Sequence, residues 1–359
     1  MTLLHRTLMR GWGHSPVGMI ALATWAWWAP LITWQDRWGD FVHHFPMTLT
    51  MVVGSFIAGA TSEGGGAVAF PVLTLVFGVA PSIARDFALM IQSVGMTAAA
   101  VAIIRARIPV AWAAVAPVSL GGALGLVGGL TWLSPLMPPA LVKIFFCCLW
   151  LSFAVALHLI SLRGSAGQTD DFRPGECGLP VPALFGIGLL GGVISSLVGS
   201  GIDILTFAFL TLHSRLNERV ATPTSVILMA VNAVVGFSWQ GAVRGVIDPQ
   251  AWSFWYVCVP VVVLGAPLGA WFIRNRSSAF IRRLLYVCIW AQFIGAVLIL
   301  PFSPSLFLVG SSTFAAGSLL FVLLGRRGAR RLQERVRSQE ADPLVATSRR
   351  GDPCPDPGT

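Results

Sequence analysis

The chain contains one apolar, glycine-interrupted segment twice. Gly54–Thr74 aligns without a gap with Gly191–Thr211, and each copy has a glycine-rich break, SEGGG at residues 62–66 and GSGID at residues 199–203. A similar apolar run follows each break, FPVLTL in the first copy and FAFLTL in the second. Duplicated apolar segments that glycine interrupts at corresponding places are typical of secondary transporters whose binding site lies between two repeats.

The composition identifies the solvent in which these repeats fold. The mean hydropathy is +0.76, and 55% of the residues are hydrophobic whereas 11% are charged. A typical soluble domain has about 25% charged residues. Apolar stretches long enough to cross about 30 Å of hydrocarbon recur from Val17 to Leu324. A β-barrel would show short alternating strands instead, so the sequence predicts an all-α integral membrane protein.

Glycine, proline and charge mark the boundaries of the predicted segments. In each repeat a glycine-broken helix hairpin precedes three transmembrane helices, and one extra span lies at each end of the chain. The expected order is an N-terminal cytoplasmic segment with the first span (1–46), repeat 1 (47–160), a cytoplasmic linker (161–181), repeat 2 (182–301), the last span (302–325) and a disordered, basic cytoplasmic tail (326–359).

We expect each glycine-broken pair, over 47–77 and 183–213, to be a re-entrant hairpin. Divided at its glycines, the first pair gives arms from Gly54 to Glu63 and from Gly66 to Phe77. As helices these arms would be about 15–18 Å long, which is half the thickness of a bilayer. Broken backbone at membrane depth is tolerated only where protein or water surrounds it. Each hairpin should therefore enter and leave on the same side.

The basic residues predict the orientation in the membrane. With the N-terminus inside, all of the 24 Lys and Arg residues fall on the cytoplasmic side except Arg37, Arg85, Lys143 and Arg244. This agrees with the positive-inside rule and explains the basic charge without nucleic-acid binding. Both termini are then cytoplasmic. Repeat 1 starts outside and repeat 2 inside, so we expect two inverted repeats that can open alternately to each side.

The broken hairpins resemble those of the sulfite exporter TauE/SafE family, over about residues 47–300. A proline followed by two spaced glycines also occurs in both halves, as Pro117, Gly121 and Gly125 in the first half and as Pro260, Gly265 and Gly269 in the second. One tryptophan also matches between the halves, Trp150 with Trp290. The resemblance implies a permease of the inner cell membrane that exports a small sulfur-containing or organic anion, such as sulfite or sulfoacetate.

The first half departs from the family just after its hairpin. The family tends to show Ala followed by small hydroxyl residues there, and the second half keeps this pattern as ATPTS at 221–225. The first half has Ala84, Arg85, Asp86 and Phe87 at the corresponding place. We expect Arg85 and Asp86 to form a local ion pair at an outer span end. An anion vestibule is the alternative.

The hairpin breaks are the candidate anion site. A helix N-terminus offers unpaired N–H groups and about half a positive charge, and the second arm of each hairpin begins directly after its glycines. Two such N-termini meeting at the midplane would form a symmetric anion cradle. The candidate substrate-binding residues are Ser62, Gly64, Gly65, Gly66, Gln92, Gly199, Ser200, Gly201, Thr222, Ser225 and Asn232.

Other interpretations of these small and polar residues remain open. The hairpin glycines could serve close helix packing alone. Packing is the favoured interpretation for the spaced glycines of the proline motifs. Gln92 and Asn232 lie in corresponding spans, where an amide either joins helices or lines the path of the substrate.

Two carboxylates lie in the hairpin breaks, Glu63 and Asp203. A charge near the centre of a membrane costs about 2.5–3.5 kcal/mol on insertion scales, so it usually has a partner or a task. Each is a candidate for coupling export to the proton gradient. The alternatives are a solvated carboxylate at an aqueous mouth and an ion pair, for instance between Glu63 and Arg85.

No pattern indicates an enzyme. The sequence has no phosphate-binding loop, no zinc-protease motif and no nucleophile elbow, and its 6 Cys show no metal-like spacing. We therefore expect no cofactor and no nucleic-acid partner. The expected partners are a small anion, the lipid bilayer and protons. The alternative function is a non-transporting membrane subunit or scaffold for a neighbouring enzyme, in which the hairpin glycines and Glu63 would tolerate replacement.

Overall fold

The computed structural model describes residues 16–61, 66–161, 181–274, 276–299 and 303–341. This part of the chain is helical and contains no β-strand. Nine of its helices are long and apolar enough to cross a membrane. The chain is therefore a multi-pass, all-helical membrane protein, as its composition predicts.

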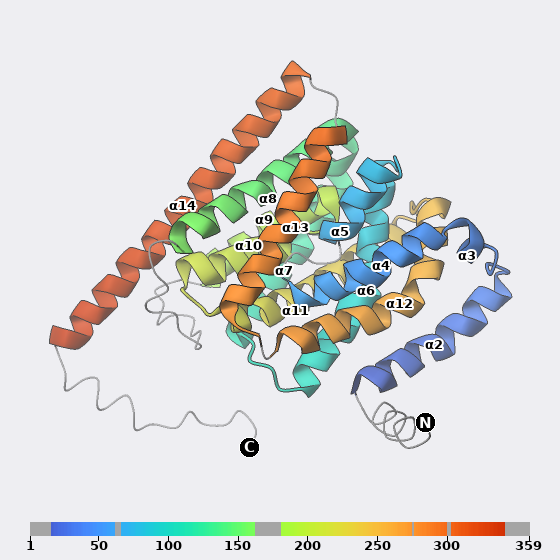
Figure 1. Cartoon of the computed structure of the whole chain (residues 1–359), viewed down its shortest axis with the longest axis horizontal. Coiled ribbons are helices and arrows are strands. Elements are labelled where there is room, and N and C mark those ends of the chain that lie inside the picture. Colours follow the sequence, from blue (N-terminus) through green and yellow to red (C-terminus); the bar gives the residue numbers. More distant parts are fainter. Residues whose placement is uncertain (1–15, 62–65, 162–180, 275, 300–302, 342–359) are drawn as a thin grey trace.

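The helices follow the order expected from the apolar runs (Figure 1). The long helices are α2 (Pro16–Trp34), α6 (Pro81–Arg105), α7 (Trp112–Gly128), α8 (Pro139–Ser161), α9 (Val181–Val198), α11 (Glu218–Ser238), α12 (Pro249–Ile273), α13 (Ser278–Ile299) and α14 (Pro304–Ala341). Shorter elements are α3 (Asp40–His43), α4 (Phe45–Ala60), α5 (Gly66–Pro71), α10 (Ile202–Ala208), the π-helical turns η1 (Val72–Val76), η2 (Gly129–Leu133), η4 (Phe209–His213) and η5 (Trp239–Val243), and the 3₁₀ turn η3 (Ser134–Leu136).

Each glycine-broken pair has one long arm and one short arm. Hairpin 1 consists of α4, α5 and η1, and hairpin 2 consists of α9, α10 and η4. The first arms contain 16 and 18 residues, which correspond to about 24 and 27 Å. They are longer than the half-bilayer arms expected from the sequence. The expected division at Gly54 was wrong, because this glycine is buried within α4 and does not end the helix.

The long arm of each hairpin packs on a span of the other half of the chain. Helix α4 packs on α12, and α9 packs on α7. The contacts are close because glycines allow backbone to meet backbone. A Cβ atom added at Gly121 would overlap the Phe185 carbonyl, and one added at Gly269 would overlap the Phe56 carbonyl. Gly125 and Gly265 are equally crowded, which confirms the packing interpretation of the four spaced glycines.

Helices α6 and α11 lie side by side at the centre and run in opposite directions. At one end, Gln240 of η5, the turn that follows α11, donates to Asp86 near the start of α6. At the other end, the Ala111 N–H that follows α6 donates to Thr224 near the start of α11. We call these the Arg85 end and the Arg219 end. The 20 residues of α6 from Asp86 to Arg105 separate the two ends by about 30 Å, at about 1.5 Å per residue.

The N-terminal span, α2, is fixed to the bundle by tryptophans. Trp25 Nε1 donates to the Pro260 carbonyl at 3.2 Å, and Trp28 Nε1 donates to the Tyr256 carbonyl at 2.9 Å. Both acceptors lie on α12, which packs against α4 and α6 as well. The extra span therefore packs on α12 and on the central helix α6, at the outside of the two repeats.

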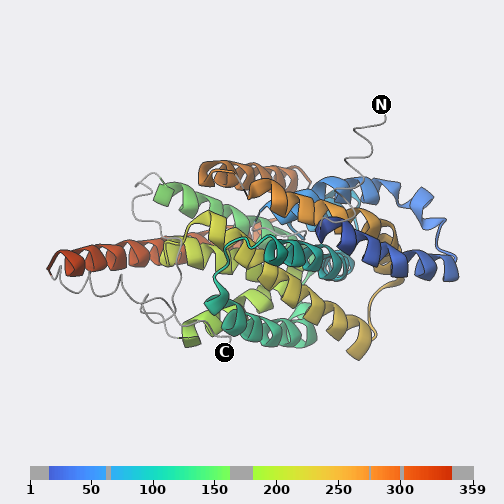
Figure 2. The same cartoon turned by 90° about the horizontal axis from the view of Figure 1, so that it is seen from below.

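The C-terminal helix α14 packs along α8 and η4 and extends beyond the rest of the bundle (Figures 1 and 2). It continues to Ala341, so the expectation of disorder from residue 326 is wrong for 326–341. The Arg, Leu, Gln and Glu residues of this stretch are good helix formers, and a charged helix can continue past the membrane. Residues 342–359 lie outside the described part of the chain.

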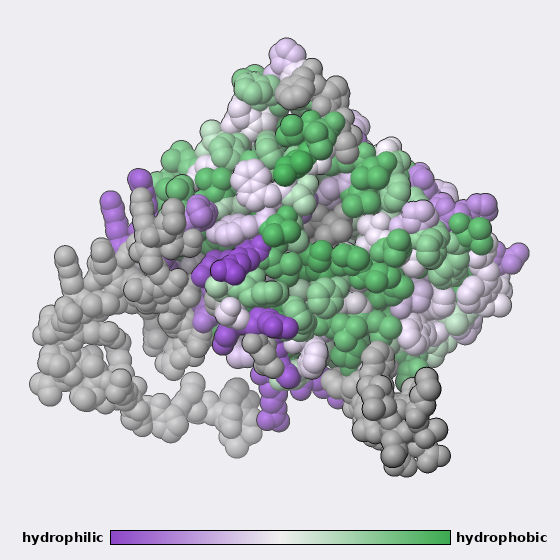
Figure 3. Space-filling model, viewed as in Figure 1, coloured by the Kyte–Doolittle hydropathy of each residue, from purple (hydrophilic) through white to green (hydrophobic). Residues whose placement is uncertain are grey.

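The surface has a broad apolar face. Figure 3 shows hydrophobic residues across the middle of the molecule, over α4, α12 and α13, with hydrophilic residues gathered near α3 and where α12 ends and α13 begins. An apolar surface of this extent fits lipid, because lipid tails cover apolar side chains without cost. The charged edges mark the two opposite ends of the bundle.

Candidate functional site

The turn of hairpin 2 is closed by its own backbone and by two serines. Gly199 has φ of +81°, a conformation that glycine adopts without strain. Its N–H donates to the Ser195 carbonyl at 2.7 Å, which ends α9. The Ser195 hydroxyl accepts from the Ile202 N–H at 3.1 Å, at the first residue of α10. The first N–H of the returning arm is therefore used within the turn.

The carboxylate of Asp203 fastens the same turn. One oxygen accepts from the Ser200 hydroxyl at 2.8 Å, and the other accepts from the Gly201 N–H at 2.7 Å. Asp203 is 1% exposed, which excludes the solvated carboxylate considered as one interpretation of the sequence. Its place in the first turn of α10 is favourable for a negative charge. Glu63, the carboxylate of the first hairpin break, lies outside the described residues.

Two amide side chains reach hairpin 2 from the central helices. Gln92 of α6 donates from Nε2 to the Gly199 carbonyl at 3.1 Å, while its Oε1 is buried without a hydrogen-bond partner. Both amide atoms of Asn232 in α11 are buried and unpartnered. Asn232 Oδ1 lies against Gly122 beside Ile202. Buried polar groups without partners are uncommon, so Gln92 Oε1 and both amide atoms of Asn232 stand out as unused hydrogen-bonding groups near this turn. Gln92 also joins two helices.

A cavity of about 250 Å³ lies at the Arg219 end, beside hairpin 1. Its lining includes Arg219, Arg274 and Thr222, together with Gly59, the second-last residue of α4. Thr222 is 0% exposed, and its hydroxyl has no hydrogen-bond partner. Both arginines are exposed. The cavity thus places two surface cations, one of which also donates from Arg219 Nε to the Arg276 carbonyl at 3.0 Å, beside the end of α4 and over the buried Thr222.

A buried ion pair occupies the Arg85 end. Arg85 Nη2 lies 2.7 Å from Asp86 Oδ1, and both residues are less than a tenth exposed. Gln240 Nε2 donates to the same oxygen at 3.2 Å, and Arg244 Nη1 donates to Gln240 Oε1 at 3.2 Å. Arg85 also donates to Ser134. The expected local ion pair is confirmed, but it is buried within a network and does not lie exposed at a span end.

The predicted site residues fall into two groups. Gln92 and Asn232 lie at the turn of hairpin 2, whereas Thr222 lines the cavity at the Arg219 end. Ten residues of α11 separate Thr222 from Asn232, which is about 15 Å along the helix. Ser225 donates to the Thr222 carbonyl of its own helix. Of the first hairpin break, Gly66 begins α5, and Ser62, Glu63, Gly64 and Gly65 lie outside the described residues.

Several residues of the two ends were not singled out in the sequence. Arg219, Arg274 and Arg244 had served to orient the spans, and Gln240 had no assigned role. The signal that could have found Gln240 is a polar residue near the end of an otherwise apolar run. No such signal identifies Ser195, because one serine in an apolar helix usually bonds its own backbone.

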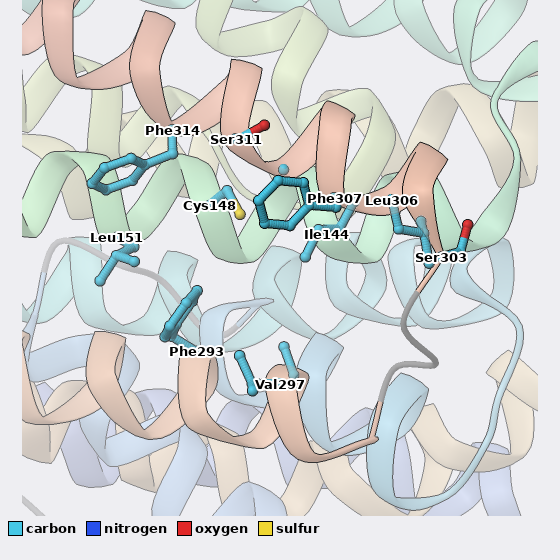
Figure 4. A pocket seen from close by; sticks show the side chains of 12 residues that line it. Ile144, Cys148, Leu151, Phe293, Val297, Ser303, Leu306, Phe307, Ser311 and Phe314 are labelled. Atoms are coloured by element: carbon cyan, nitrogen blue, oxygen red, sulfur yellow. The ribbon is translucent and has the colours of Figure 1, made fainter.

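A second cavity, which is lined mostly by apolar side chains, is a poor site for an anion. It has about 420 Å³ and lies between α8, α13 and α14, lined by side chains such as Phe293, Phe307 and Phe314 (Figure 4). None of the described residues that line it is charged. Within the described residues, no group of three His, Cys, Asp or Glu side chains is placed to hold a metal ion. The cavity at the Arg219 end is therefore the candidate site.

Membrane-spanning helices with two interrupted helix pairs, and a cavity that contains two arginines, are features typical of membrane transport proteins. The sequence model of the sulfite exporter TauE/SafE family matches residues 47–295, and the chain belongs to this family. No curated protein and no solved structure matches the chain. The matched range covers both hairpins and excludes α2 and α14, so the family relation rests on the two halves that contain the sites described above.

Proposed function

We propose that this transporter is a secondary-active permease that exports a small sulfur-containing or organic anion, such as sulfite or sulfoacetate, from the cytoplasm across the inner cell membrane. The observation that carries the proposal is the cavity at the Arg219 end, where Arg219, Arg274 and the unused Thr222 hydroxyl lie beside hairpin 1. Two positive charges in one cavity, with an unused hydroxyl directly behind its wall, favour an anionic ligand.

The chemistry of the cavity supports an oxyanion. A guanidinium group presents several N–H donors in a plane and binds carboxylate, sulfite or sulfonate oxygens in pairs. The volume of about 250 Å³ is smaller than that of most sites for drug-sized ligands, which suits an anion of a few heavy atoms. The Arg219 end has most of the basic residues, so the positive-inside rule places it in the cytoplasm, with both termini.

The proposed mechanism is alternating access between two inverted repeats. Support comes from the reciprocal packing of the hairpins, in which α4 lies on α12 and α9 lies on α7. Each half then holds the interrupted helix of the other, and a rocking motion of the halves would move both breaks relative to α6 and α11. The anion would load at the Arg219 end and leave at the Arg85 end.

The proposed coupling ion is the proton, with Asp203 as its carrier and Glu63, the carboxylate of the first hairpin break, as the other candidate. Asp203 suits this role because a buried carboxylate in a membrane protein is most often functional. Its two donors, Ser200 and the Gly201 N–H, also hold the turn. Protonation would remove the charge that the turn now stabilises and would loosen hairpin 2.

Efflux of radiolabelled sulfite from proteoliposomes tests transport. We expect saturable efflux from the wild type, with a large loss in R219Q/R274Q. The matched control is R276Q, because Arg276 lies in the same connection but packs over Phe272 and does not line the cavity. Absence of efflux of sulfite, sulfoacetate and acetate from well-folded protein would favour the scaffold alternative.

The D203N variant tests the coupling separately. Asn can accept from the Gly201 N–H and donate to the Ser200 hydroxyl, so the turn keeps both contacts. If Asp203 carries the proton, an imposed proton gradient no longer changes the rate of efflux in D203N. If efflux responds to the gradient as in the wild type, the permease stands and this carboxylate has a structural role.

A further inference from the structure

The two halves of the chain differ most at one pair of corresponding positions. The sequence repeat places Arg85 opposite Thr222, and Asp86 opposite Pro223. In the structure, Thr222 lines an open cavity next to Gly59 of hairpin 1. Arg85 lies in contact with hairpin 2, because a Cβ atom added at Gly199 would come within 3.0 Å of the Arg85 carbonyl oxygen. One hairpin therefore lies beside a cavity, and the other touches the backbone of a residue whose side chain forms a buried ion pair.

The environment of the Asp86 carboxylate is an oxyanion site. Its Oδ1 accepts from Arg85 Nε at 2.8 Å and from Gln240 Nε2 at 3.2 Å, and it lies 2.7 Å from Arg85 Nη2. Three N–H groups on one oxygen form the kind of donor set that binds a sulfite, sulfonate or carboxylate oxygen. Asp86 is joined to Arg85 in sequence, so it supplies this oxygen without a ligand.

The donors continue in both directions from this carboxylate. Towards the surface, the exposed Arg244 donates to Gln240 Oε1 at 3.2 Å and to the Leu130 carbonyl at 3.0 Å. Towards the interior, the turn of hairpin 2 follows, where Gln92 Nε2 holds the Gly199 carbonyl. The cluster contains two arginines and one carboxylate, so it has an excess positive charge that a further anion would balance.

We propose that Arg85, Gln240 and Arg244 form a second oxyanion site, at the end of the bundle opposite the Arg219 cavity, and that Asp86 keeps it closed as a tethered carboxylate which the exported oxyanion displaces. The inference deepens the proposed function and rests on it. A leaving anion takes the donors of Asp86, and the return of Asp86 releases the anion and closes this end again. Without the internal carboxylate the site would hold its ligand more tightly.

Equilibrium binding of radiolabelled sulfite to the purified full chain in nanodiscs tests the second site. D86N keeps an acceptor for Gln240 but removes the competing charge. We expect about tenfold tighter binding of sulfite, because a larger fraction of the protein then has the Arg85 donors available to the ligand. The gain should persist in the R219Q/R274Q background and disappear in R85Q/D86N, whose pair is neutral on both sides. No gain in folded D86N, or a gain that remains in R85Q/D86N, overturns the proposal.

A second variant avoids the buried pair. Arg244 is exposed, and R244Q should weaken about tenfold the inhibition of efflux by sulfite added on the Arg244 side. R37Q is the matched control, because Arg37 contacts Ser253 at the same end and lies outside the cluster. Inhibition unchanged in R244Q contradicts the second site. If the wild type exports sulfite, R219Q/R274Q abolishes this efflux, and neither D86N nor R244Q has any effect, the second site is refuted and the proposed function stands. A wild type that neither binds nor exports any tested oxyanion sinks the proposed function as well.

Discussion

The two ends of the α6–α11 pair differ in what lies beside a hairpin. At the Arg219 end, a cavity of about 250 Å³ reaches Gly59 and the unused hydroxyl of Thr222. At the Arg85 end, the side chains of Arg85, Asp86 and Gln240 form a hydrogen-bonded ion pair, and the backbone of Arg85 contacts the turn of hairpin 2. Two similar halves thus provide one open and one closed end. Under the proposed function, this difference separates the loading side from the release side.

The comparison also shows how few residues create such a difference. Thr222 and Arg85 occupy corresponding positions in the repeat. A threonine side chain is too short to cross the space beside the hairpin, whereas an arginine reaches Asp86 and Ser134 at once. The closed end therefore depends on charge pairing and the open end on the absence of a long side chain. The predictions below act on one end at a time.

The largest effect should come from breaking the closed end with Asp86→Ala. This change leaves the Arg85 guanidinium buried without its carboxylate, and loss of one partner of a buried ion pair costs about 3–5 kcal/mol. Thr222→Ala at the open end removes a hydroxyl that has no hydrogen-bond partner, so stability should hardly change. Thermal unfolding of the purified proteins measures both. Small and equal losses would show that the closed end is not held by the pair.

The next effect concerns the contact between hairpin 2 and the closed end. In Gly199→Ala the new Cβ atom would lie 2.7 Å from the Ala88 Cβ, at a backbone φ of +81°. Strain of this kind costs about 1–3 kcal/mol, and the turn should move away from Arg85. Gly186→Ala in α9 is the control, because no neighbouring atom lies within 4 Å of its Cβ position. Both are measured by thermal unfolding, and equal stability of the two variants is the contrary result.

A smaller effect, on the affinity for sulfite, should distinguish the cavity at the open end from the basic surface around it. Arg274→Gln removes one cation of the cavity, and we expect the KM for sulfite efflux to rise about tenfold with little change in the maximal rate, because a charge-assisted hydrogen bond is worth about 1.5–3 kcal/mol. Arg276→Gln serves as the control. Equal changes in the two variants would mean that general surface charge attracts the anion and that the cavity does not bind it.

The smallest effect should come from Thr222→Val, which keeps the shape of the side chain and removes its donor. One neutral hydrogen bond to the anion is worth about 0.5–1.5 kcal/mol, so the KM should rise about threefold at unchanged stability. Thr50→Val is the control, since that hydroxyl donates to the Pro46 carbonyl within α4. A KM equal to that of the wild type would leave the arginines as the ligands and remove Thr222 from the site.

Much of the fold could be predicted from the sequence because a membrane imposes it. Long apolar runs must become helices, so the spans from α6 to α13 lie where the apolar runs indicate. The spaced glycines, such as Gly121 and Gly269, were expected to serve packing, and they do. The arm lengths of the hairpins could not be predicted, because glycine ends a helix in some surroundings and allows close contact in others.

The candidate site was less predictable, because its residues come from segments far apart in the chain. The sequence singled out Thr222, Gln92 and Asn232 as polar residues in apolar spans, but gave no reason to place Thr222 with Arg274 or Asn232 with hairpin 2. Those neighbours follow from the way α7, α9, α11 and α12 cross. The hydrogen bonds of Asp203 likewise depend on the path of the turn.

By itself, the sequence determined that the protein lies in a membrane, that it has two similar halves, and that each half contains a broken helix. These properties follow from hydropathy and repetition, which need no knowledge of contacts. The tertiary structure alone decided that Arg85 is buried with Asp86 and Gln240 while Arg219 and Arg274 line a cavity. The physical reason is that the role of a charged side chain depends on its distance from other charges and on its exposure, and both are set by packing between helices.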